Sequence, residues 1–300
     1  MKILLAGANG MLGHEVLGVL ESRGHEVIAT DIEATDIEAT DIERTMIRMD
    51  ITDSADVNRV LSSVEPLWLV NCAAWTRVDA CEDHEDAAFR LNALAPGILA
   101  SACRDRGIRF LQISSDYVFD GTKADMYVEE DTPNPINAYG RTKLAGEIAV
   151  KDRMDDYIII RPQWLFGPHG PNFVATILDL ARDREHIEVV NDQFGSPTYA
   201  RDLANGIAAL MEVNARGVFH VSNRGIASWY DLAKKACELM EFNTRVVPVD
   251  SGQFPRPAAR PANSTLSTQR FSQATGSLLP PWQISLKAYL RFYIQQKRRL

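Results

Sequence analysis

Short apolar runs alternate with amphipathic stretches through the first half of the chain. The runs that have the length and the aliphatic composition of buried strands are residues 2–6, 25–30, 46–49, 67–70, 109–113 and 156–161. Strands that are apolar on both faces are typical of a parallel sheet with helices on each side. The alternation of strand and helix therefore predicts an α/β fold with a Rossmann-like, doubly wound parallel sheet.

Helical periodicity fills the stretches between these strands and continues beyond Gly167. Helices are expected at residues 14–23, 53–63, 83–106, 172–182, 201–211, 228–240 and 282–299, and further strands at 187–190 and 218–222. Pro96 is expected to bend the long run 83–106. The pattern predicts a cofactor-binding Rossmann domain at residues 1–163 and a smaller C-terminal α/β domain, mainly substrate-binding, at 164–300. Elements around 195–225 are expected to return to the first domain.

A glycine-rich segment, GANGMLG, follows the first strand and leads into a helix. Gly7, Gly10 and Gly13 allow a tight turn and the close approach of a pyrophosphate, whose charge the helix N-terminus stabilises. Their spacing is G-x-x-G-x-x-G, whereas the common dinucleotide fingerprint is G-x-G-x-x-G. An ordinary glycine-rich turn is the alternative, but its place after the first strand favours a dinucleotide cofactor.

An acidic residue, Asp31, closes the second strand. A carboxylate there can accept hydrogen bonds from the adenosine ribose and disfavours a 2′-phosphate. A repeat overlaps this position, with TDIEA starting at Thr30 and Thr35 and TDIER at Thr40. Its isoleucines recur every five residues, which matches neither a helical nor a strand face. We interpret the repeat as a lengthened acidic surface loop and Asp31 as the ribose ligand.

Small and polar residues follow the third and fourth strands, at the edge where open α/β sheets bind ligands. Asp50 follows the third strand, a usual place for contact with an adenine ring. The segment NCAAWT, residues 71–76, leaves the fourth strand, and its small side chains allow a cofactor to lie against the backbone. Asn92, in the next helix, is expected either to hydrogen-bond behind the site or to be a structural core residue.

Tyr139 and Lys143 lie four residues apart in the segment PNPINAYGRTKLAGE, where a helix is expected to begin near Ala138. A free phenol has a pKa of about 10 and is a poor acid–base group at neutral pH. A nearby ammonium group favours the phenolate and lowers that pKa. Alone, the pattern is more often a solvated pair on a helix. Ser115, at the end of the fifth strand, would face Tyr139 across the cleft of a doubly wound sheet, which favours catalysis.

Composition narrows the classes of function further. The formal net charge of −8 argues against nucleic-acid binding. The four cysteines show no C-x-x-C spacing, which favours reduced thiols, and the six histidines show no metal-ligand spacing. The apolar start of the chain is too short for a signal peptide or a membrane span. We therefore expect a soluble, cytoplasmic protein without a resident metal and without a membrane or nucleic-acid partner.

Together these segments resemble those of the extended short-chain dehydrogenase/reductase superfamily, and within it those of the dTDP-4-dehydrorhamnose reductases. The resemblance runs nearly end to end and rests first on GANGMLG, NCAAWTRVD, SSDYVFDG and YGRTKLAGE. The glycine spacing is that of the superfamily. The later segments GPNF, NDQFGSPT and RPANSTL, together with Trp164, make the resemblance to these reductases specific.

The resemblance implies that NADH or NADPH reduces the C4 ketone of dTDP-4-dehydro-L-rhamnose to give dTDP-L-rhamnose. Tyr139 would protonate the sugar oxygen, and Lys143 would lower the Tyr139 pKa and hold the nicotinamide ribose. Ser115, where the family usually has Thr, would orient the ketone. With the glycines and the Tyr–Lys pair, the expected cofactor contacts are Met11, Leu12, Asp31, Asp50, Ile51, Ala74, Trp75 and Thr76.

The expected substrate contacts are Ser115, Asp116, Trp164 and Arg260. Asp116 and Trp164 fall on substrate positions of the family, and the Trp164 ring offers an apolar plane for a 6-deoxy sugar. The Arg260 guanidinium is a candidate partner for the nucleotide diphosphate because it can pair bidentately with phosphate oxygens.

Two alternative functions stay open. One is another nucleotide-sugar enzyme of the superfamily, an epimerase or a 4,6-dehydratase. Dehydratases carry an Asp-Glu pair after the site hydroxyl, whereas here Asp116 is followed by Tyr117. The other is a non-catalytic regulatory subunit resembling the β subunit of methionine adenosyltransferase, which hydride transfer by the purified chain would exclude.

A homodimer is compatible with the resemblance. Some members of the family bind a divalent ion between two subunits through acidic residues. Glu15 matches one of these acids, but Arg201 stands where another would be. The sequence therefore argues against a metal-linked dimer.

Overall fold

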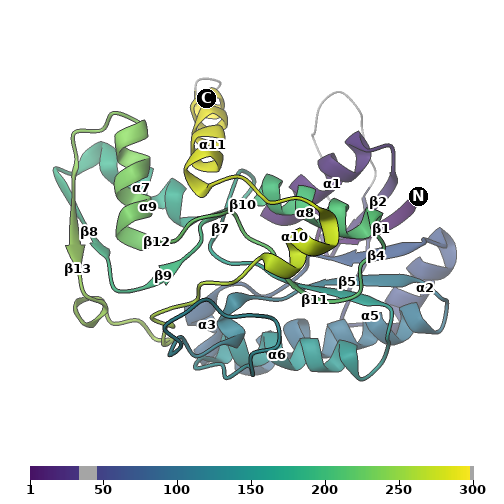
Figure 1. Ribbon diagram of the computed structural model, residues 1–300. Coiled ribbons are helices and arrows are strands. Elements are labelled where there is room, and N and C mark those ends of the chain that lie inside the picture. Colours follow the sequence, from purple (N-terminus) through teal and green to yellow (C-terminus); the bar gives the residue numbers. More distant parts are fainter. Residues whose placement is uncertain (34–45, 298–300) are drawn as a thin grey trace.

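Parallel strands form the central sheet of the protein (Figure 1). In the computed structural model, which describes residues 1–33 and 46–297, seven strands lie in the order β11-β6-β5-β4-β1-β2-β3. They are β1 (Lys2–Ala6), β2 (Glu26–Asp31), β3 (Ile47–Arg48), β4 (Trp68–Asn71), β5 (Arg109–Ile113), β6 (Tyr157–Arg161) and β11 (Gly217–His220). The strand order reverses between β1 and β4, where a doubly wound sheet opens a crevice for ligands. The predicted fold class is confirmed.

Helices cover both faces of this sheet, as Figure 1 shows. On one face, α1 (Met11–Ser22) and α8 (Ala200–Glu212) pack in the same core cluster as Leu5. On the opposite face, α2 (Ser54–Val64), α5 (Ala95–Arg104) and α6 (Ala138–Lys151) pack in the same cluster as Leu4. Leu4 and Leu5 are neighbours on β1 and are both fully buried, because successive strand residues point to opposite faces. This explains why the strand sequences are apolar without alternation.

The helical region around residues 78–104 differs from the single bent helix that the sequence predicts. It consists of α3 (Val78–Asp83), α4 (Glu85–Phe89), the wide π turn η1 (Arg90–Leu94) and α5. Pro96 lies in the first turn of α5 and has no N–H to donate to the carbonyl of Asn92, four residues earlier. That carbonyl faces α6, where a Cβ on Gly146 would lie only 2.1 Å from the Asn92 oxygen. Pro96 therefore begins α5 and leaves a wide turn before it.

Two other predicted boundaries are wrong. Helix α1 begins at Met11 rather than at residue 14, with Gly10 as its N-cap, so the helix starts inside the glycine turn. Strand β3 is only two residues long, although Met46 and Met49 beside it are buried.

Residues 34–45, which hold most of the TDIEA repeat, lie outside the part of the chain that the structure describes. The interpretation of the repeat as a surface loop therefore stays a prediction.

A second lobe lies beside the sheet. Its helices α7 (Phe173–Asp183) and α9 (Trp229–Leu239) share one core cluster with the parallel pair β8 (His186–Val190) and β13 (Arg245–Val249). The same two helices share a second cluster with α11 (Trp282–Lys297). The remaining elements are β7 (Leu165–Phe166), β9 (Phe194–Gly195), β10 (Thr198–Tyr199), β12 (Ala227–Ser228), α10 (Gln269–Thr275), η2 (Asp116–Val118) and η3 (Ser251–Gln253). Strand β13, which contains Pro248, was not predicted.

The chain enters the second lobe, returns to the sheet with α8 and β11, and then leaves it again. The division at residues 163 and 164 into a cofactor domain and a substrate domain stays a prediction. Within residues 1–33 and 46–297, no helix has the length and apolar character needed to cross a membrane.

Replacement of Gly146 by alanine should destabilise the fold, because the new Cβ would meet the Asn92 carbonyl and push α6 away from η1. We expect a loss of about 1–3 kcal/mol in the free energy of unfolding, measured by urea denaturation. Gly18→Ala is the matched control: Gly18 lies in α1 with no atom within 4 Å of its added Cβ. That change should be neutral or stabilise by about 0.5–1 kcal/mol. An unchanged midpoint for Gly146→Ala would contradict the close contact.

Candidate active site

A cavity of about 1220 Å³ opens at the carboxyl edge of the central sheet. Its wall is formed by the glycine turn after β1 and by the segments that follow β2, β3, β4, β5 and β6. Phe173 and Trp229 of the second lobe also line it. Ligand pockets usually measure about 300–1,000 Å³. The cavity is therefore large enough for a dinucleotide and a second ligand.

Most of the predicted site residues line this one cavity. They are Gly7, Gly10, Met11, Leu12, Asp31, Asp50, Ile51, Ala74, Trp75, Thr76, Ser115, Asp116, Tyr139, Lys143, Trp164 and Arg260. Gly13 is the exception: it lies one turn into α1, where a Cβ would come within 2.0 Å of the Gly7 carbonyl oxygen. Its role is to let the helix pack against the loop. The sequence did not predict three further residues that line the cavity: Phe173, Trp229 and Gln163.

The glycine turn is shaped to receive an anion. Gly7 has a φ of +78°, and a Cβ there would lie 2.4 Å from the backbone nitrogen of Ala73, so only glycine fits. Gly10, the N-cap of α1, brings no side chain to cap the first turn of the helix. The first-turn residues Met11 and Leu12 line the cavity. An uncapped helix N-terminus suits the pyrophosphate of a nicotinamide dinucleotide.

Two carboxylates flank the place expected for the adenosine. Asp31 Oδ2 accepts the backbone N–H of Asn9 at 3.0 Å, and its Oδ1 accepts that of Ile32 at 2.8 Å. These bonds fasten the Asp31 carboxylate to the glycine turn. Asp50 Oδ1 accepts the backbone N–H and the hydroxyl of Thr52, at 2.9 and 2.7 Å, so this carboxylate shapes its own turn.

The segment after β4 is held in place from behind by Asn92. The Asn92 Oδ1 accepts the backbone N–H of Trp75 at 2.9 Å, and its Nδ2 donates to the Trp75 carbonyl at 3.0 Å. The same amide donates to the hydroxyl of Thr142 on α6 at 3.1 Å. Asn92 therefore fixes the cavity wall next to the predicted catalytic helix.

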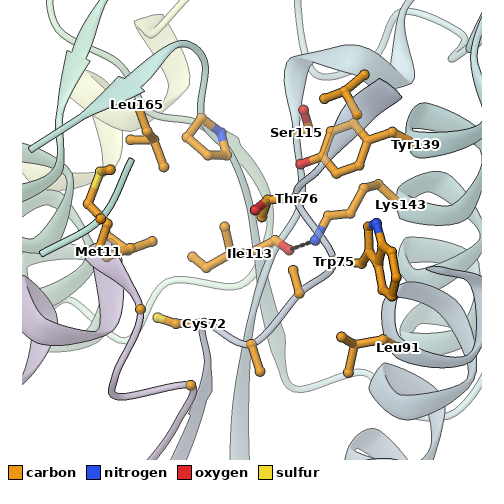
Figure 2. Close-up of a pocket in the computed structure, with 18 of the residues that line it drawn as sticks. Met11, Cys72, Trp75, Thr76, Leu91, Ile113, Ser115, Tyr139, Lys143 and Leu165 are labelled. Atoms are coloured by element: carbon orange, nitrogen blue, oxygen red, sulfur yellow. Dashed lines mark hydrogen bonds between the residues drawn. The ribbon is translucent and has the colours of Figure 1, made fainter. Parts of the chain in front are cut away.

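Ser115, Tyr139 and Lys143 come together on one side of the cavity (Figure 2). The Asn137 side chain caps α6 by accepting the backbone N–H of Gly140 at 2.7 Å, which places Tyr139 in the first turn. Figure 2 shows the Tyr139 ring and the Ser115 side chain directed toward one another. Lys143 lies one turn further along and donates through Nζ to the carbonyl of Ile113 at 2.6 Å.

The pKa values of this cluster follow from its burial. Burial raises the pKa of Tyr139 above its ordinary value, and the hydrogen bond with Ser115 lowers it in part. Burial also lowers the pKa of Lys143 to about 8, against the attraction of Glu147 and Cys72. The expected lowering of the Tyr139 pKa by Lys143 is not found. The Lys143 ammonium group donates to the Ile113 carbonyl instead.

Some polar atoms on the cavity wall are buried and lack partners among the described residues: Trp75 Nε1, Asp116 Oδ2 and Gln163 Nε2. Buried polar groups in proteins are nearly always hydrogen-bonded, so these atoms are suited to a polar ligand. Asp116 lies beside the catalytic cluster, and its Oδ1 accepts the Ser115 hydroxyl at 3.0 Å. Burial raises the pKa of Asp116 to about 7, while hydroxyls of Ser264 and Ser115 act in the opposite direction.

Trp164 does not offer the open plane that the sequence suggests. Its indole stacks on that of Trp229, with ring centroids 3.6 Å apart and planes at 7°. A Cβ on Gly195 would lie 2.5 Å from Trp164 Cε2, so Gly195 packs against the other face. Trp164 also has a φ of +46°, a strained conformation for a bulky residue. The ring therefore reaches the cavity by its edge, in a stack shared by both lobes.

Arg260 reaches the cavity but already has a partner. Its Nη1 lies 2.8 Å from Asp79 Oδ1 and donates to the Ala258 carbonyl at 2.7 Å. Asp79 largely balances the charge, so Arg260 is less available to a diphosphate than its sequence position suggests. Arg201, which stands where some family members have an acid that binds a metal ion between subunits, places its Nη1 3.9 Å from Glu15 Oε2. Residues 1–33 and 46–297 contain no group of three or more His, Cys, Asp or Glu placed to bind a metal ion.

The glycine turn, the acid at the end of β2 and the Ser–Tyr–Lys cluster on a doubly wound sheet define the class of protein, an extended short-chain dehydrogenase/reductase. Residues 1–294 match the family model described as RmlD substrate binding domain, and the chain belongs to this family.

Known relatives agree with this assignment over nearly their whole length. The chain is 40% identical to a dTDP-4-keto-6-deoxy-D-glucose reductase of Streptomyces niveus, covering 94% of each protein. The crystal structure of a dTDP-4-dehydrorhamnose reductase from Clostridium acetobutylicum superposes with a TM-score of 0.90 at 40% identity, covering 98% of this chain and 99% of that one. A reductase of the same name from Bacillus anthracis, solved in complex with NADP, gives a TM-score of 0.89 at 35% identity, covering 96% and 98%.

Asp31 should bias the protein toward NADH, because a fixed carboxylate repels the 2′-phosphate of NADPH. We expect the kcat/KM ratio of NADH to NADPH to fall about tenfold in Asp31→Ser, since the repulsion is screened at a partly exposed site. Glu33→Ser is the control: it removes the same charge from an exposed position two residues away. A strong NADPH preference in the parent protein, or an equal effect of both variants, would contradict this role of Asp31.

Proposed function

We propose that the protein reduces the C4 ketone of dTDP-4-dehydro-L-rhamnose to give dTDP-L-rhamnose, with NADH or NADPH as the reductant. The observation that carries this proposal is the cluster of Ser115, Tyr139 and Lys143 on the wall of a cavity that begins at a dinucleotide-binding turn. The relatives named dTDP-4-dehydrorhamnose reductase support the substrate, and the NADP complex of one of them supports the cofactor.

The reaction requires a hydride at C4 and a proton at the C4 oxygen. A reduced nicotinamide, when bound, supplies the hydride. Tyr139 holds the proton: burial keeps its pKa high, so the phenol is protonated at neutral pH, the form that a proton donor needs. The Ser115 hydroxyl, bonded to Tyr139, is placed to orient the ketone oxygen. Lys143, one turn further along α6, lines the same cavity and is placed to hold the nicotinamide ribose.

Features of the site disfavour the alternative reactions. Dehydration of a nucleotide sugar needs a base beside the acid, but Asp116 is followed by Tyr117, whose ring packs edge-on against Tyr139 with centroids 5.8 Å apart. A purely regulatory subunit would not need the Ser–Tyr–Lys cluster.

A cytoplasmic location and a homodimer stay predictions from the sequence.

A second substrate is favoured by one relative. The Streptomyces niveus protein is named for dTDP-4-keto-6-deoxy-D-glucose, which differs from dTDP-4-dehydro-L-rhamnose in the configuration of its ring carbons. Both sugars present a ketone at C4 and a methyl group at C6, so the same cluster can serve either.

Tyr139→Phe should abolish most turnover while leaving the fold and the cofactor affinity nearly unchanged. The ring is kept but the proton donor is lost, which typically costs about 10²–10⁴-fold in rate. The measurement is oxidation of the reduced nicotinamide with the dTDP-linked ketone. Tyr230→Phe, at a tyrosine that does not line the cavity, should retain full activity. Near-normal turnover by Tyr139→Phe would refute the assignment.

The substrate itself can be identified by comparing kcat/KM for the two dTDP-linked ketones with that for GDP- and UDP-linked 4-keto sugars. We expect a clear preference for dTDP-4-dehydro-L-rhamnose. Equal rates with all nucleotides would show that the cavity does not recognise thymidine. A preference for dTDP-4-keto-6-deoxy-D-glucose would show that this ketone is the substrate, and the proposed reductase chemistry would stand.

A further inference from the structure

A buried ion pair lies directly behind the catalytic cluster. Arg161 donates through Nε to Glu147 Oε1 at 2.8 Å and through Nη2 to Oε2 at 2.7 Å. The two side chains are 1% and 0% exposed. Such pairs add little net stability, because the cost of removing two charges from water offsets their attraction. Well-packed apolar residues could fill the same space, so the buried charges require another explanation.

The pair is connected to the segment that carries Ser115. The hydroxyl of Ser114 donates to Glu147 Oε1 at 2.6 Å. The carbonyl of the preceding residue, Ile113, accepts the Lys143 ammonium at 2.6 Å and the Gln112 side-chain amide at 2.7 Å. Lys143 and Glu147 are four residues apart, on the same face of α6. Helix α6 therefore holds the end of β5 at two successive residues, immediately before Ser115.

The pair is also connected to the segment after β6, which lines the cavity. Arg161 is the last residue of β6 and is followed by Pro162, Gln163 and Trp164, which line the cavity. The segments that carry Tyr139, Ser115 and Trp164 are thus all connected to the carboxylate of Glu147.

We propose that Glu147 is a positioning residue of the reductase: locked by Arg161, its carboxylate fixes Ser114 next to Ser115 and supplies the buried negative charge for the Lys143 ammonium. The proposal rests on the function proposed above. Glu147 does not itself line the cavity, so it acts only through these two neighbours.

The charges around the pair support this role. Burial lowers the pKa of Lys143 to about 8, and the attraction of Glu147 is the largest effect that opposes it. Lys143 also faces Cys72, beyond β4, while Glu147 also faces Lys151 on α6 and Tyr157 on β6. On the far side, Arg161 Nη1 lies 3.4 Å from His220 Nε2 on β11, and burial lowers the His220 pKa to about 3, so His220 is neutral.

The sign of the pH effect follows from this arrangement. Lys143 is charged below its pKa and neutral above it, so activity that needs the ammonium falls as the pH rises through that pKa. Loss of the Glu147 carboxylate lowers the Lys143 pKa further. The fall in activity should then occur at a lower pH.

The test compares the pH profile of kcat for Glu147→Gln, Glu147→Asp and the parent protein. In Glu147→Gln the alkaline fall should move down by about one pH unit, whereas Glu147→Asp, which keeps the charge, should retain the parent profile. Lys151→Gln is the matched control, since it removes a half-buried cationic partner of Glu147, 3.3 Å from Oε2. A reduced melting temperature in Glu147→Gln without any shift of the profile would overturn the proposal.

Glu147→Gln leaves Arg161 with an uncompensated charge and can fail to fold. Ser114→Ala then tests the same inference, because it breaks the link to the segment of Ser115 and keeps the ion pair. It should lower kcat about three- to tenfold with an unchanged KM and cofactor affinity. An unchanged kcat would overturn the positioning role.

A readout without substrate separates this inference from the proposed function. In protein labelled with ¹³C at lysine Cε, the Lys143 signal, identified by its absence from Lys143→Arg, should titrate near pH 8 and shift down in Glu147→Gln. If no dTDP-linked ketone is reduced but this shift occurs, the proposed function fails and the role of Glu147 toward Lys143 stands. If the ketone is reduced but the titration does not move, only the inference fails.

Discussion

The close approach of helix α6 to the strand ends is the constraint on which the site depends. Two glycines make it possible: a Cβ on Gly140 would lie 2.1 Å from the Tyr117 carbonyl oxygen, and one on Gly146 equally close to that of Asn92. At this distance Lys143 can reach the Ile113 carbonyl. A helix displaced by the width of a methyl group would separate the phenol from the hydroxyl that it contacts. The catalytic geometry is thus set by backbone packing as much as by the catalytic side chains.

The parts of this structure that the sequence predicts are those encoded within single segments. Strands such as residues 2–6 and 109–113 are continuous apolar runs, and their burial between helices requires only local composition. The glycine turn and the Y-x-x-x-K pair are also local, and chain order places them at the same edge of a doubly wound sheet. This is why the glycine turn and the Tyr139–Lys143 pair could be predicted from the chain itself. Contacts such as Met11, Ile51 and Asp116 were expected only from the resemblance to the reductase family.

The parts that the sequence does not predict depend on contacts between distant segments. Trp229 lies far along the chain from Trp164, and nothing near either residue indicates that their rings stack. The partner of Arg260 is Asp79, from another part of the chain, and it changes the charge that Arg260 offers. The wide turn before Pro96 is visible only once α6 packs against it. Local patterns thus predict which residues surround the cavity, whereas tertiary packing determines how each one is presented.

The place of β11 in the sheet has a consequence for synthesis of the chain. Strand β11 pairs with β6 at the edge of the sheet, yet β6 ends at Arg161 and β11 begins only at Gly217. While the intervening segment is being translated, the isoleucine-rich strand β6 has one unpaired edge, and such edges template association with other chains. A product truncated within that segment would keep this edge exposed. The nascent chain therefore carries all of its catalytic residues while its sheet still has an unpaired edge.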